Sequence, residues 1–374
     1  MPTILYVNAT GEISGAERSL LSLLDALNRD RWTPAVVSPA GPLAAAVEAR
    51  GIQHVPLALA PVRYPHSVRE AWTLLSNLRW GRRHLLKIIR TERPELLHAN
   101  SSSAMLFTPS VAHLPVIWQV RDLTPLGIFG SCMYGRASRV AVISSAVRAE
   151  VERYARDGGG KISLLPPAVD TAVFQPVTER SAVRTALDLP TDVPLIGLLA
   201  QFVPWKRHHL FLDALTHLTD LRWHAVMGGA DFNADPAYLF DLRARITCFP
   251  FAGRISWLSW QHDPSALLSA LDICALTSKF EPFGRVLIEA MACAVPVVSV
   301  DEGGVRDIIR PEENGLLTSP DPVALAAALR RLLENAALRE RLGLSGRAYV
   351  QTYFSLEVQR RKLDELYSLT ANSC

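Results

Sequence analysis

Cysteine is scarce in this sequence of 374 residues, and its five cysteines are scattered along the chain. No two form a Cys-x-x-Cys pair, so we expect neither a zinc site nor a disulfide framework, and we expect a reducing compartment. No stretch approaches the roughly 18 apolar residues of a membrane-spanning helix. The first residues, MPTILYVNAT, enter a strand-like run without a basic segment, so no signal peptide is predicted. These absences predict a cytoplasmic protein.

Three motifs that bind nucleotides or metal ions are also missing. The sequence contains no Asp-x-Asp, no Gly-x-Gly-x-x-Gly and no P-loop motif. Their absence disfavours a diphosphate clamped by a metal ion, a Rossmann dehydrogenase and a P-loop enzyme. We therefore predict no metal ion and no other cofactor.

The composition is that of a globular protein, with 49% hydrophobic and 20% charged residues. The net charge of +3 predicts no nucleic-acid partner. The charge is unevenly distributed, because residues 1–170 carry a net +6 and residues 171–374 a net −3. The two halves of the chain therefore differ electrostatically.

Strand-like and helix-like segments alternate through both halves of the chain. In the first half, strands are predicted at 3–8, 35–38, 95–98, 115–120 and 139–143. In the second half, they are predicted at 195–200, 224–227, 246–251, 273–276 and 295–300, with a final helix at 355–369. Prolines in 164–176 indicate a linker. The pattern predicts two doubly wound parallel sheets, in two lobes that face a cleft.

The most informative segment is SKFEPFGRVLIEAMA, residues 278–292. A turn at Pro282 and Gly284 precedes a predicted helix, and a helix N-terminus binds phosphate through its unpaired N–H groups. Glu281 and Glu289 lie on either side of this phosphate site, where their carboxylates can accept hydrogen bonds from sugar hydroxyls. The spacing alone equally fits two solvated helix acids.

Two loops that follow predicted strands carry further candidates. Lys206 and Arg207 follow the strand at 195–200 and can neutralise a diphosphate leaving group, although a surface basic pair is the more common explanation of a lone Lys-Arg. The loop at 301–307 contains two glycines that permit close backbone approach. Ser14-Gly15-Ala16-Glu17 occupies the equivalent place after the first strand.

Together these segments resemble glycosyltransferase family 4, whose members are retaining enzymes with the two-lobed GT-B architecture. The resemblance spans essentially the whole chain and rests chiefly on EPFGRVLIEAMA, the following PVVS and GGVRD, and PWKR. SGAER, VISSAV and AVDTAVF add to it. It implies an acceptor-binding lobe over 1–172, completed by the C-terminal helix at 355–374, and a donor-binding lobe over 173–354.

The resemblance also implies roles for single residues. Glu281 would contact hydroxyls of the donor sugar, Glu289 would hold the ribose hydroxyls, and Lys206 would contact the diphosphate. The diphosphate would further be surrounded, mainly through backbone N–H groups, by Phe283, Gly284, Arg285 and Val286. Gly253 and Arg254, which follow the predicted strand 246–251, would edge the base pocket, and Gly15 would lie across the cleft.

Three positions depart from the family pattern. Ala200-Gln201 stands where Gly-Arg is usual, so one expected diphosphate cation is missing, and Arg207 is a candidate to compensate for it. Arg121, followed by Asp122, stands where a histidine often contacts the donor sugar. Ala294 replaces a glycine, which would cost about 1 kcal/mol if the backbone there has a positive φ.

The implied reaction transfers a hexose-like sugar from a nucleotide diphosphosugar to a hydroxyl of a glycan or lipid-linked acceptor. A role in surface polysaccharide or glycolipid synthesis is expected. The alternatives are a sugar-nucleotide epimerase or hydrolase of the same fold, and a binding protein without turnover. On the acceptor side the candidates are His98, Arg121 and Asp122, with a structural histidine an equal explanation of His98.

A basic amphipathic segment lies in the first half of the chain. Residues 77–93 carry six arginines and lysines and a single acid, interleaved with apolar residues. Such a segment suits an anionic membrane surface, and equally a helix that packs on the core with a basic solvent face. If the segment binds a membrane surface, we expect peripheral attachment to the inner face of the plasma membrane.

Overall fold

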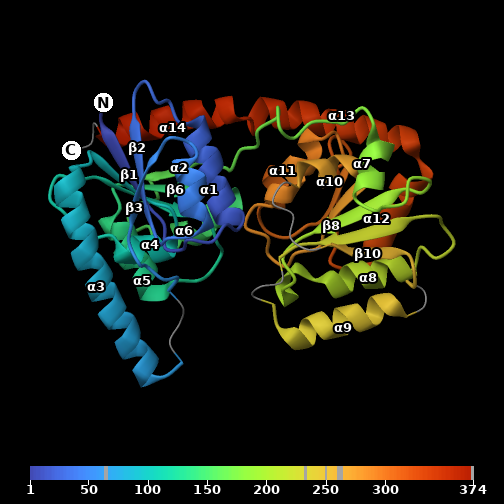
Figure 1. The fold of residues 1–374 in the computed structure, drawn as a ribbon, viewed down its shortest axis with the longest axis horizontal. Helices are drawn as coiled ribbons and strands as arrows, with labels where there is room; N and C mark the ends of the chain where they lie inside the picture. Colours follow the sequence, from blue (N-terminus) through green and yellow to red (C-terminus); the bar gives the residue numbers. More distant parts are fainter. Residues whose placement is uncertain (63–65, 231–233, 249–250, 259–263, 372–374) are drawn as a thin grey trace. The chain divides into compact units, whose positions relative to one another are not determined.

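The computed structural model describes residues 1–62, 66–230, 234–248, 251–258 and 264–371. The chain divides into two compact units (Figure 1). Unit 1 comprises Met1–Ala168 and Leu356–Cys374, and unit 2 comprises Val169–Ser355. Each unit contains its own parallel sheet, and in each the strand order runs outward in both directions from the centre. The predicted α/β class with two doubly wound sheets is therefore confirmed.

The sheet of unit 1 has seven strands, and its buried Val, Ile and Leu residues are typical of strands covered on both faces. The order is β3-β2-β1-β4-β5-β6-β7. The strands are β1 (Thr3–Val7), β2 (Thr33–Ser38), β3 (Gln53–Pro56), β4 (Leu96–Ala99), β5 (Val116–Val120), β6 (Arg139–Val142) and β7 (Ile162–Leu164).

Helices connect these strands, and the last helix of the chain joins the same core. They are α1 (Gly15–Ala26), α2 (Pro42–Glu48), α3 (Val68–Glu92), α4 (Ser102–Phe107), α5 (Gly127–Arg136), α6 (Ser145–Glu152) and α14 (Leu356–Ala371). A capping box of Ser14 and Glu17 starts α1. Leu363, Leu366 and Tyr367 of α14 are buried in the apolar cluster formed by β1 and α1. The C-terminal helix is thus part of unit 1 although it follows unit 2 in the sequence.

The sheet of unit 2 has six strands in the order β10-β9-β8-β11-β12-β13. They are β8 (Leu195–Leu199), β9 (His224–Gly228), β10 (Ile255–Leu258), β11 (Ile273–Leu276), β12 (Val297–Val300) and β13 (Leu316–Thr318). The helical elements are α7 (Arg180–Ala186), η1 (Pro204–Lys206), α8 (His208–Thr216), α9 (Pro236–Thr247), α10 (Ser265–Ala270), α11 (Arg285–Ala292), η2 (Gly304–Asp307), α12 (Pro322–Glu334) and α13 (Ala336–Tyr353).

The strand predicted at 246–251 is wrong as far as the described residues show, and residues 249–250 lie outside them. Ile246 belongs to α9, which ends at Thr247, and the next strand, β10, begins only at Ile255. Leu239, Leu242 and Ile246 recur at helical spacing and pack on the core of unit 2, so burial of this face makes the segment helical. The short edge strands β3, β7 and β13 were not predicted, since three or four residues give little periodic signal.

The strand order places a topological switch point in each sheet. In unit 2 the chain leaves β8 toward β9 on one side and later returns to β11 on the other, so β8 and β11 are neighbours whose following loops diverge. Ligands of such sheets bind outside the carboxyl ends of the strands at this point. In unit 2 the loop after β8 leads to Lys206, and the loop after β11 leads to Glu281.

The helices of the structure include none suited to crossing a bilayer, as far as the described residues extend. The longest, α3, has charged residues throughout its second half and buries only Gly81, Leu85 and Ile89.

Candidate functional site

Lys206 and Glu281 meet at the switch point of unit 2. The Nζ atom of Lys206 lies 2.7 Å from Oε2 of Glu281, and the two side chains are only 13% and 10% exposed. The Thr277 hydroxyl donates a hydrogen bond to the carbonyl oxygen of Lys206 at 2.7 Å. The loops after β8 and β11 are therefore bonded through both side chain and backbone, which places a mostly buried cation and carboxylate side by side.

The N-terminus of α11 begins directly beyond Glu281. Gly284 caps it with a φ of 98°, a left-handed conformation that glycine adopts without strain. The ring of Phe283 is buried and packs edge-on against Phe354 at 5.7 Å between ring centroids, so only the backbone of Phe283 faces the turn. Val286 is half-buried in the first turn. The first-turn N–H groups of α11 thus form an anion-binding end next to Lys206.

Glu289 lies one further turn along the buried side of α11. Its side chain is 7% exposed and accepts a hydrogen bond from Nε of Arg285 at 2.6 Å. The Arg285 side chain therefore lies along the helix toward Glu289. Both glutamates of the motif are buried and paired with cations, and neither is the solvated helix acid that the spacing alone also allowed.

Arg207 is held by a partner that the sequence did not suggest. Its backbone has a φ of 51°, and both of its terminal nitrogens donate to Oε1 of Glu302, at 3.2 and 3.3 Å. The positive charge of Arg207 is therefore taken up within unit 2. The proposed compensation for Gln201 would require Arg207 to leave Glu302.

His208 follows Arg207 and does not titrate near neutral pH. Burial, assisted by the charge of Lys206, lowers the pKa of His208 to about 3. Its ring stacks on Phe202 with 4.9 Å between centroids. The imidazole next to the site is thus neutral. Across the described ranges, no group of three or more His, Cys, Asp or Glu residues is arranged to hold a metal ion.

Gly253 and Arg254 do not join this site, which corrects the prediction that they follow a strand. They precede β10, so they lie at the amino end of a strand parallel to β9, opposite the edge that carries Lys206 and Glu281. The Arg254 guanidinium lies 3.7 Å from the ring centroid of Trp223 and donates to the carbonyl of Leu221. Arg254 therefore packs on the structure instead of edging a base pocket.

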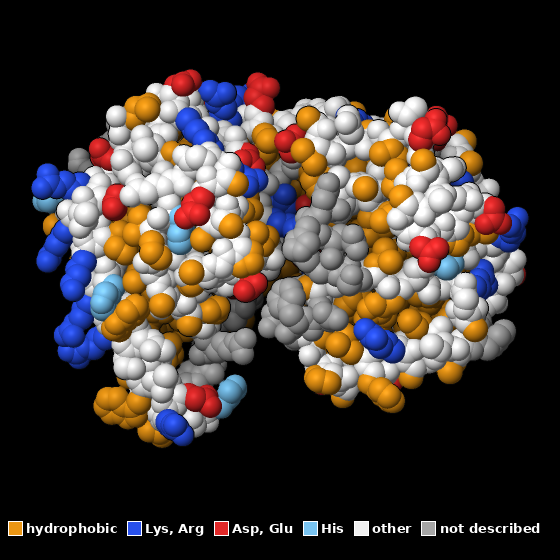
Figure 2. Space-filling view, viewed as in Figure 1, with side chains coloured by type: hydrophobic (Ala, Val, Ile, Leu, Met, Phe, Trp, Pro, Cys, Tyr) orange, Lys and Arg blue, Asp and Glu red, His pale blue; other side chains and the backbone are white. Residues whose placement is uncertain are grey.

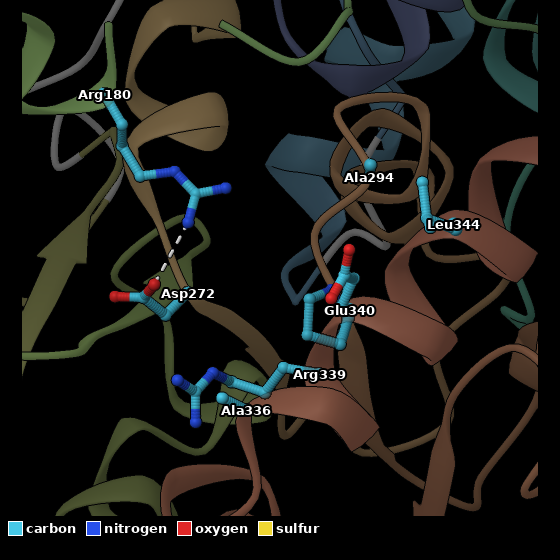
Figure 3. Close-up of a pocket in the computed structure, with 8 residues that line it drawn as sticks. Arg180, Asp272, Ala294, Ala336, Arg339, Glu340 and Leu344 are labelled. Carbon is cyan, nitrogen blue, oxygen red and sulfur yellow. Dashed lines mark hydrogen bonds and ion pairs between the residues drawn. The ribbon is translucent and has the colours of Figure 1, made fainter. Parts of the chain in front are cut away.

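A cavity of unit 2 also lies at that amino edge. It is lined by Arg180, Asp272, Ala294, Pro296, Ala336, Arg339, Glu340 and Leu344 (Figure 3). Asp272 precedes β11 and is bonded to Arg180 at 3.1 Å. None of the predicted site residues lines this cavity.

The acceptor-side candidate His98 is part of the core of unit 1. It is fully buried, Tyr367 Oη lies 2.9 Å from its Nδ1, and its Nε2 lies 3.0 Å from Oε1 of Gln119. Burial, with the nearby charge of Arg121, lowers the pKa of His98 to about 3. The structural explanation of His98 is therefore correct, and a direct contact with substrate is not supported.

Arg121 points into the same network. Its guanidinium donates to Gln119, to both oxygens of Asn100 and to the hydroxyl of Ser19 at 2.6–3.1 Å. These hydrogen bonds direct the Arg121 side chain toward the ends of β4 and β5. Arg121 therefore does not offer a sugar the imidazole group that the histidine of the family offers. Asp122 accepts the Thr124 N–H at 3.1 Å, and burial raises its pKa. Gly15 is the first residue of α1 and directly follows the capping residue Ser14 in the sequence.

Known families match both halves of the chain. The sequence model described as Glycosyltransferase Family 4 matches residues 13–173, and the one described as Glycosyl transferases group 1 matches residues 179–349.

Curated relatives match over shorter stretches. A D-inositol 3-phosphate glycosyltransferase of Xylanimonas cellulosilytica is 33% identical over 57% of this chain and 52% of its own length. The lipopolysaccharide core biosynthesis glycosyltransferase LpsE of Rhizobium meliloti is 29% identical over 46% of this chain and 49% of its own. The matched part of the chain thus spans about half the length of these relatives.

The fold is shared with a solved structure over nearly its full length. The crystal structure of Anabaena Alr3699/HepE in complex with UDP and glucose has a TM-score of 0.83 at 22% identity, covering 98% of this chain and 100% of that one. Two doubly wound units with this similarity define an α/β protein of the GT-B class. With both halves matched by its models, the chain belongs to glycosyltransferase family 4.

Proposed function

We propose that the protein transfers a hexose-type sugar from a nucleoside diphosphate sugar to a hydroxyl of a glycan or lipid-linked acceptor. The observation that carries this proposal is the arrangement at the switch point of unit 2. There the Lys206 ammonium pairs with the buried carboxylate of Glu281 just before the N-terminus of α11, and the buried carboxylate of Glu289 follows one turn into the helix. An anionic diphosphate suits the ammonium and the helix N-terminus, and sugar hydroxyls suit the carboxylates.

In the proposed reaction the acceptor oxygen forms a bond to the anomeric carbon as the bond to the diphosphate breaks. The acceptor attacks from the face on which the diphosphate leaves, and its proton passes to the departing phosphate oxygen, so the anomeric configuration is retained. Lys206 and the first-turn N–H groups of α11 stabilise the charge that develops on the leaving group. Glu281 orients the sugar and Glu289 the ribose, each after giving up part of its present ion pair.

The relatives support the chemical class of the substrates. The Anabaena structure was obtained with UDP and glucose, and the two curated relatives act on an inositol phosphate and in lipopolysaccharide core synthesis by name. A UDP-sugar is therefore the first donor to test, and phosphorylated polyols and lipid-linked glycans are the first acceptors. A role in surface polysaccharide or glycolipid synthesis fits these names.

An anionic membrane surface is the proposed partner of α3. Trp72, Arg79, Arg83 and Arg90 are exposed and recur at intervals of seven, four and seven residues, so they share one face of the helix. Figure 2 shows Lys and Arg side chains gathered along α3. Val68 and Leu75 add exposed apolar surface in the first half of the helix. Exposed tryptophans beside a basic stripe are typical of helices that lie in a lipid headgroup region.

The test of the function is a panel of UDP-, GDP- and ADP-sugars incubated with and without acceptors. Nucleotide release that requires an acceptor, with retention seen by NMR of the product, supports the proposal. Conversion of the nucleotide sugar without acceptor would instead indicate an epimerase or hydrolase. Binding in a thermal-shift assay without any turnover would indicate a protein that has lost catalysis.

A further inference from the structure

The carboxylate of Glu302 joins three loops at the carboxyl edge of the unit 2 sheet. Oε1 accepts from both terminal nitrogens of Arg207 at 3.2 and 3.3 Å, and Oε2 accepts from the backbone N–H of Phe280 at 3.1 Å. Arg207 follows β8, Phe280 follows β11, and Glu302 itself follows β12. These three strands are adjacent in the sheet. The Glu302 side chain is 17% exposed, so its bonds are largely shielded from water.

Phe280 requires such support. Its φ of 50° lies in the left-handed region, which a bulky residue without a local hydrogen bond rarely adopts. Phe280 as a whole is 59% exposed, so its side chain supplies little packing to hold the backbone in place. The bond to Glu302 is therefore a principal restraint on the residue that precedes Glu281.

The same loop also holds the peptide that follows Glu281. The N–H of Gly304 donates to the carbonyl oxygen of Glu281 at 2.7 Å. Gly303 has a φ of 82°, and a Cβ atom there would lie 2.2 Å from that carbonyl oxygen. The close approach explains why glycine is needed at position 303. Glu281 is thus fastened on both sides by residues 302–304, and its carboxylate reaches Lys206 from this fixed backbone.

We propose that Glu302 is a positioning residue for the transfer reaction. It holds Phe280 in its left-handed conformation and thereby orients the Glu281 carboxylate toward Lys206 and the donor sugar. It also keeps the Arg207 guanidinium away from the α11 N-terminus. This inference rests on the proposed function, because it assigns Glu281 to the donor sugar.

If Glu302 acted only through its ion pair with Arg207, substitutions of Glu302 would have no effect once Arg207 is removed. The positioning role predicts that the bond to the Phe280 N–H still matters without Arg207. Substitutions in the Arg207→Ala background separate the two bonds. There, Glu302→Gln keeps an acceptor oxygen for the Phe280 N–H, and Glu302→Ala removes it. A matched control is Glu312→Ala, which breaks another glutamate–arginine pair of unit 2, with Arg331 at 2.8 Å.

We expect the Gln variant to keep kcat within about threefold of the Arg207→Ala background, and the Ala variant to lose about tenfold or more. The KM for the donor should change less than kcat, because the bond positions Glu281 and does not touch the substrate. Glu312→Ala should match the wild type. Equal kcat for the Gln and Ala variants would overturn the proposal. If the Ala variant fails to fold, Glu302→Leu, which removes both acceptor oxygens and keeps the side-chain volume, should lower kcat in the same way.

Hydrogen exchange provides a readout that does not depend on activity. The Phe280 amide should exchange faster in the Ala variant than in the Gln variant, with the amides of α12 unchanged in both. Unchanged exchange at Phe280 would refute the restraint even if the wild type showed no turnover. Absence of turnover in the wild type with every donor would refute the proposed function, while faster exchange at Phe280 would still show the restraint.

Discussion

Lys206 and Glu281 form a buried ion pair across two loops that are 75 residues apart in the sequence. The cation assigned to the diphosphate is thus already neutralised by the carboxylate assigned to the donor sugar. A bound donor must therefore break this ion pair. Its phosphate accepts a hydrogen bond from Lys206, and one of its sugar hydroxyls donates a hydrogen bond to Glu281. Substitutions of the two residues should therefore have different effects on the two parts of the donor.

Lys206→Ala should weaken binding of the free nucleoside diphosphate and lower kcat/KM for transfer by about 100-fold, because the leaving group loses its nearest cation. Glu281→Gln should lower kcat to a similar extent and yet leave binding of the nucleoside diphosphate intact. Thermal-shift titrations and steady-state kinetics measure the two effects. Lys279→Ala, which removes an exposed lysine from the same loop, is the control and should behave as wild type. Wild-type kinetics in both Lys206→Ala and Glu281→Gln would refute the site.

Ala294 occupies a position that suits glycine, and replacing it should stabilise the protein. Its φ is 56°, the condition under which the sequence predicted a cost. Ala294→Gly relieves the left-handed strain of about 1–2 kcal/mol, partly offset by the greater freedom of glycine in the unfolded chain, so the free energy of unfolding should rise by about 0.5–1 kcal/mol.

Urea unfolding, followed through the transition of unit 2, measures this change. The control is Ala348→Gly at an exposed position within α13, where glycine should lower the free energy of unfolding by about 1 kcal/mol. A destabilised Ala294→Gly variant would show that the alanine methyl contributes packing that outweighs the backbone strain.

The turn and helix at 278–292 could be predicted because their signals are local. Gly284 marks the turn, and the apolar residues after it recur at helical spacing, so the motif indicates its own conformation. The alternation of strands and helices is equally local, and it determined the fold class. Ile246 was misassigned because a short apolar run fits a strand or a helix, and only packing against the core of unit 2 decides between them.

The sequence could not predict which side chains would pair, because the pairs form between segments that only the folded sheet brings together. Glu302 and Arg207 are 95 residues apart, and nothing near either residue indicates the other. His98 and Tyr367 are 269 residues apart and meet because α14 returns to unit 1. The sequence shows Glu302 only as the residue before the glycine pair at 303–304. No neighbouring residue indicates its partner or its role.

The proposed membrane face of α3 predicts binding to vesicles that contain phosphatidylglycerol and not to vesicles of phosphatidylcholine alone. The double variant Arg79→Glu/Arg83→Glu should lose about 2 kcal/mol or more of binding free energy, at about 1 kcal/mol for each basic residue near the surface. Trp72→Ala should weaken binding at both low and high salt, since it removes apolar contact.

Co-sedimentation measures both effects. Arg222→Glu and Phe240→Ala are controls on unit 2, where the side chains are also exposed but lie outside α3. They should bind vesicles as the wild type does. Binding that is insensitive to lipid charge, or equal in the Arg79→Glu/Arg83→Glu variant, would contradict the assignment of α3 and leave its basic face solvated.

The buried His98 predicts how the stability of unit 1 changes with pH. Its folded-state pKa of about 3 lies below the ordinary value of 6.5. Between pH 6.5 and about pH 3, His98 therefore binds a proton in the unfolded chain but not in the folded chain. Stability from His98 is fully present above about pH 6.5 and is lost as the pH falls toward 3, by about 1.4 kcal/mol for each pH unit.

His98→Gln removes this titration along with the hydrogen bonds to Tyr367 and Gln119. Near pH 7.5 the variant should be less stable than the wild type by about 2 kcal/mol, and this difference should shrink as the pH falls to about 5. Thermal unfolding midpoints across this range measure the convergence, with His66→Gln, at an exposed histidine, as the control. Parallel curves for His98→Gln and wild type would mean that His98 takes up a proton in the folded state, and that its network opens to admit one.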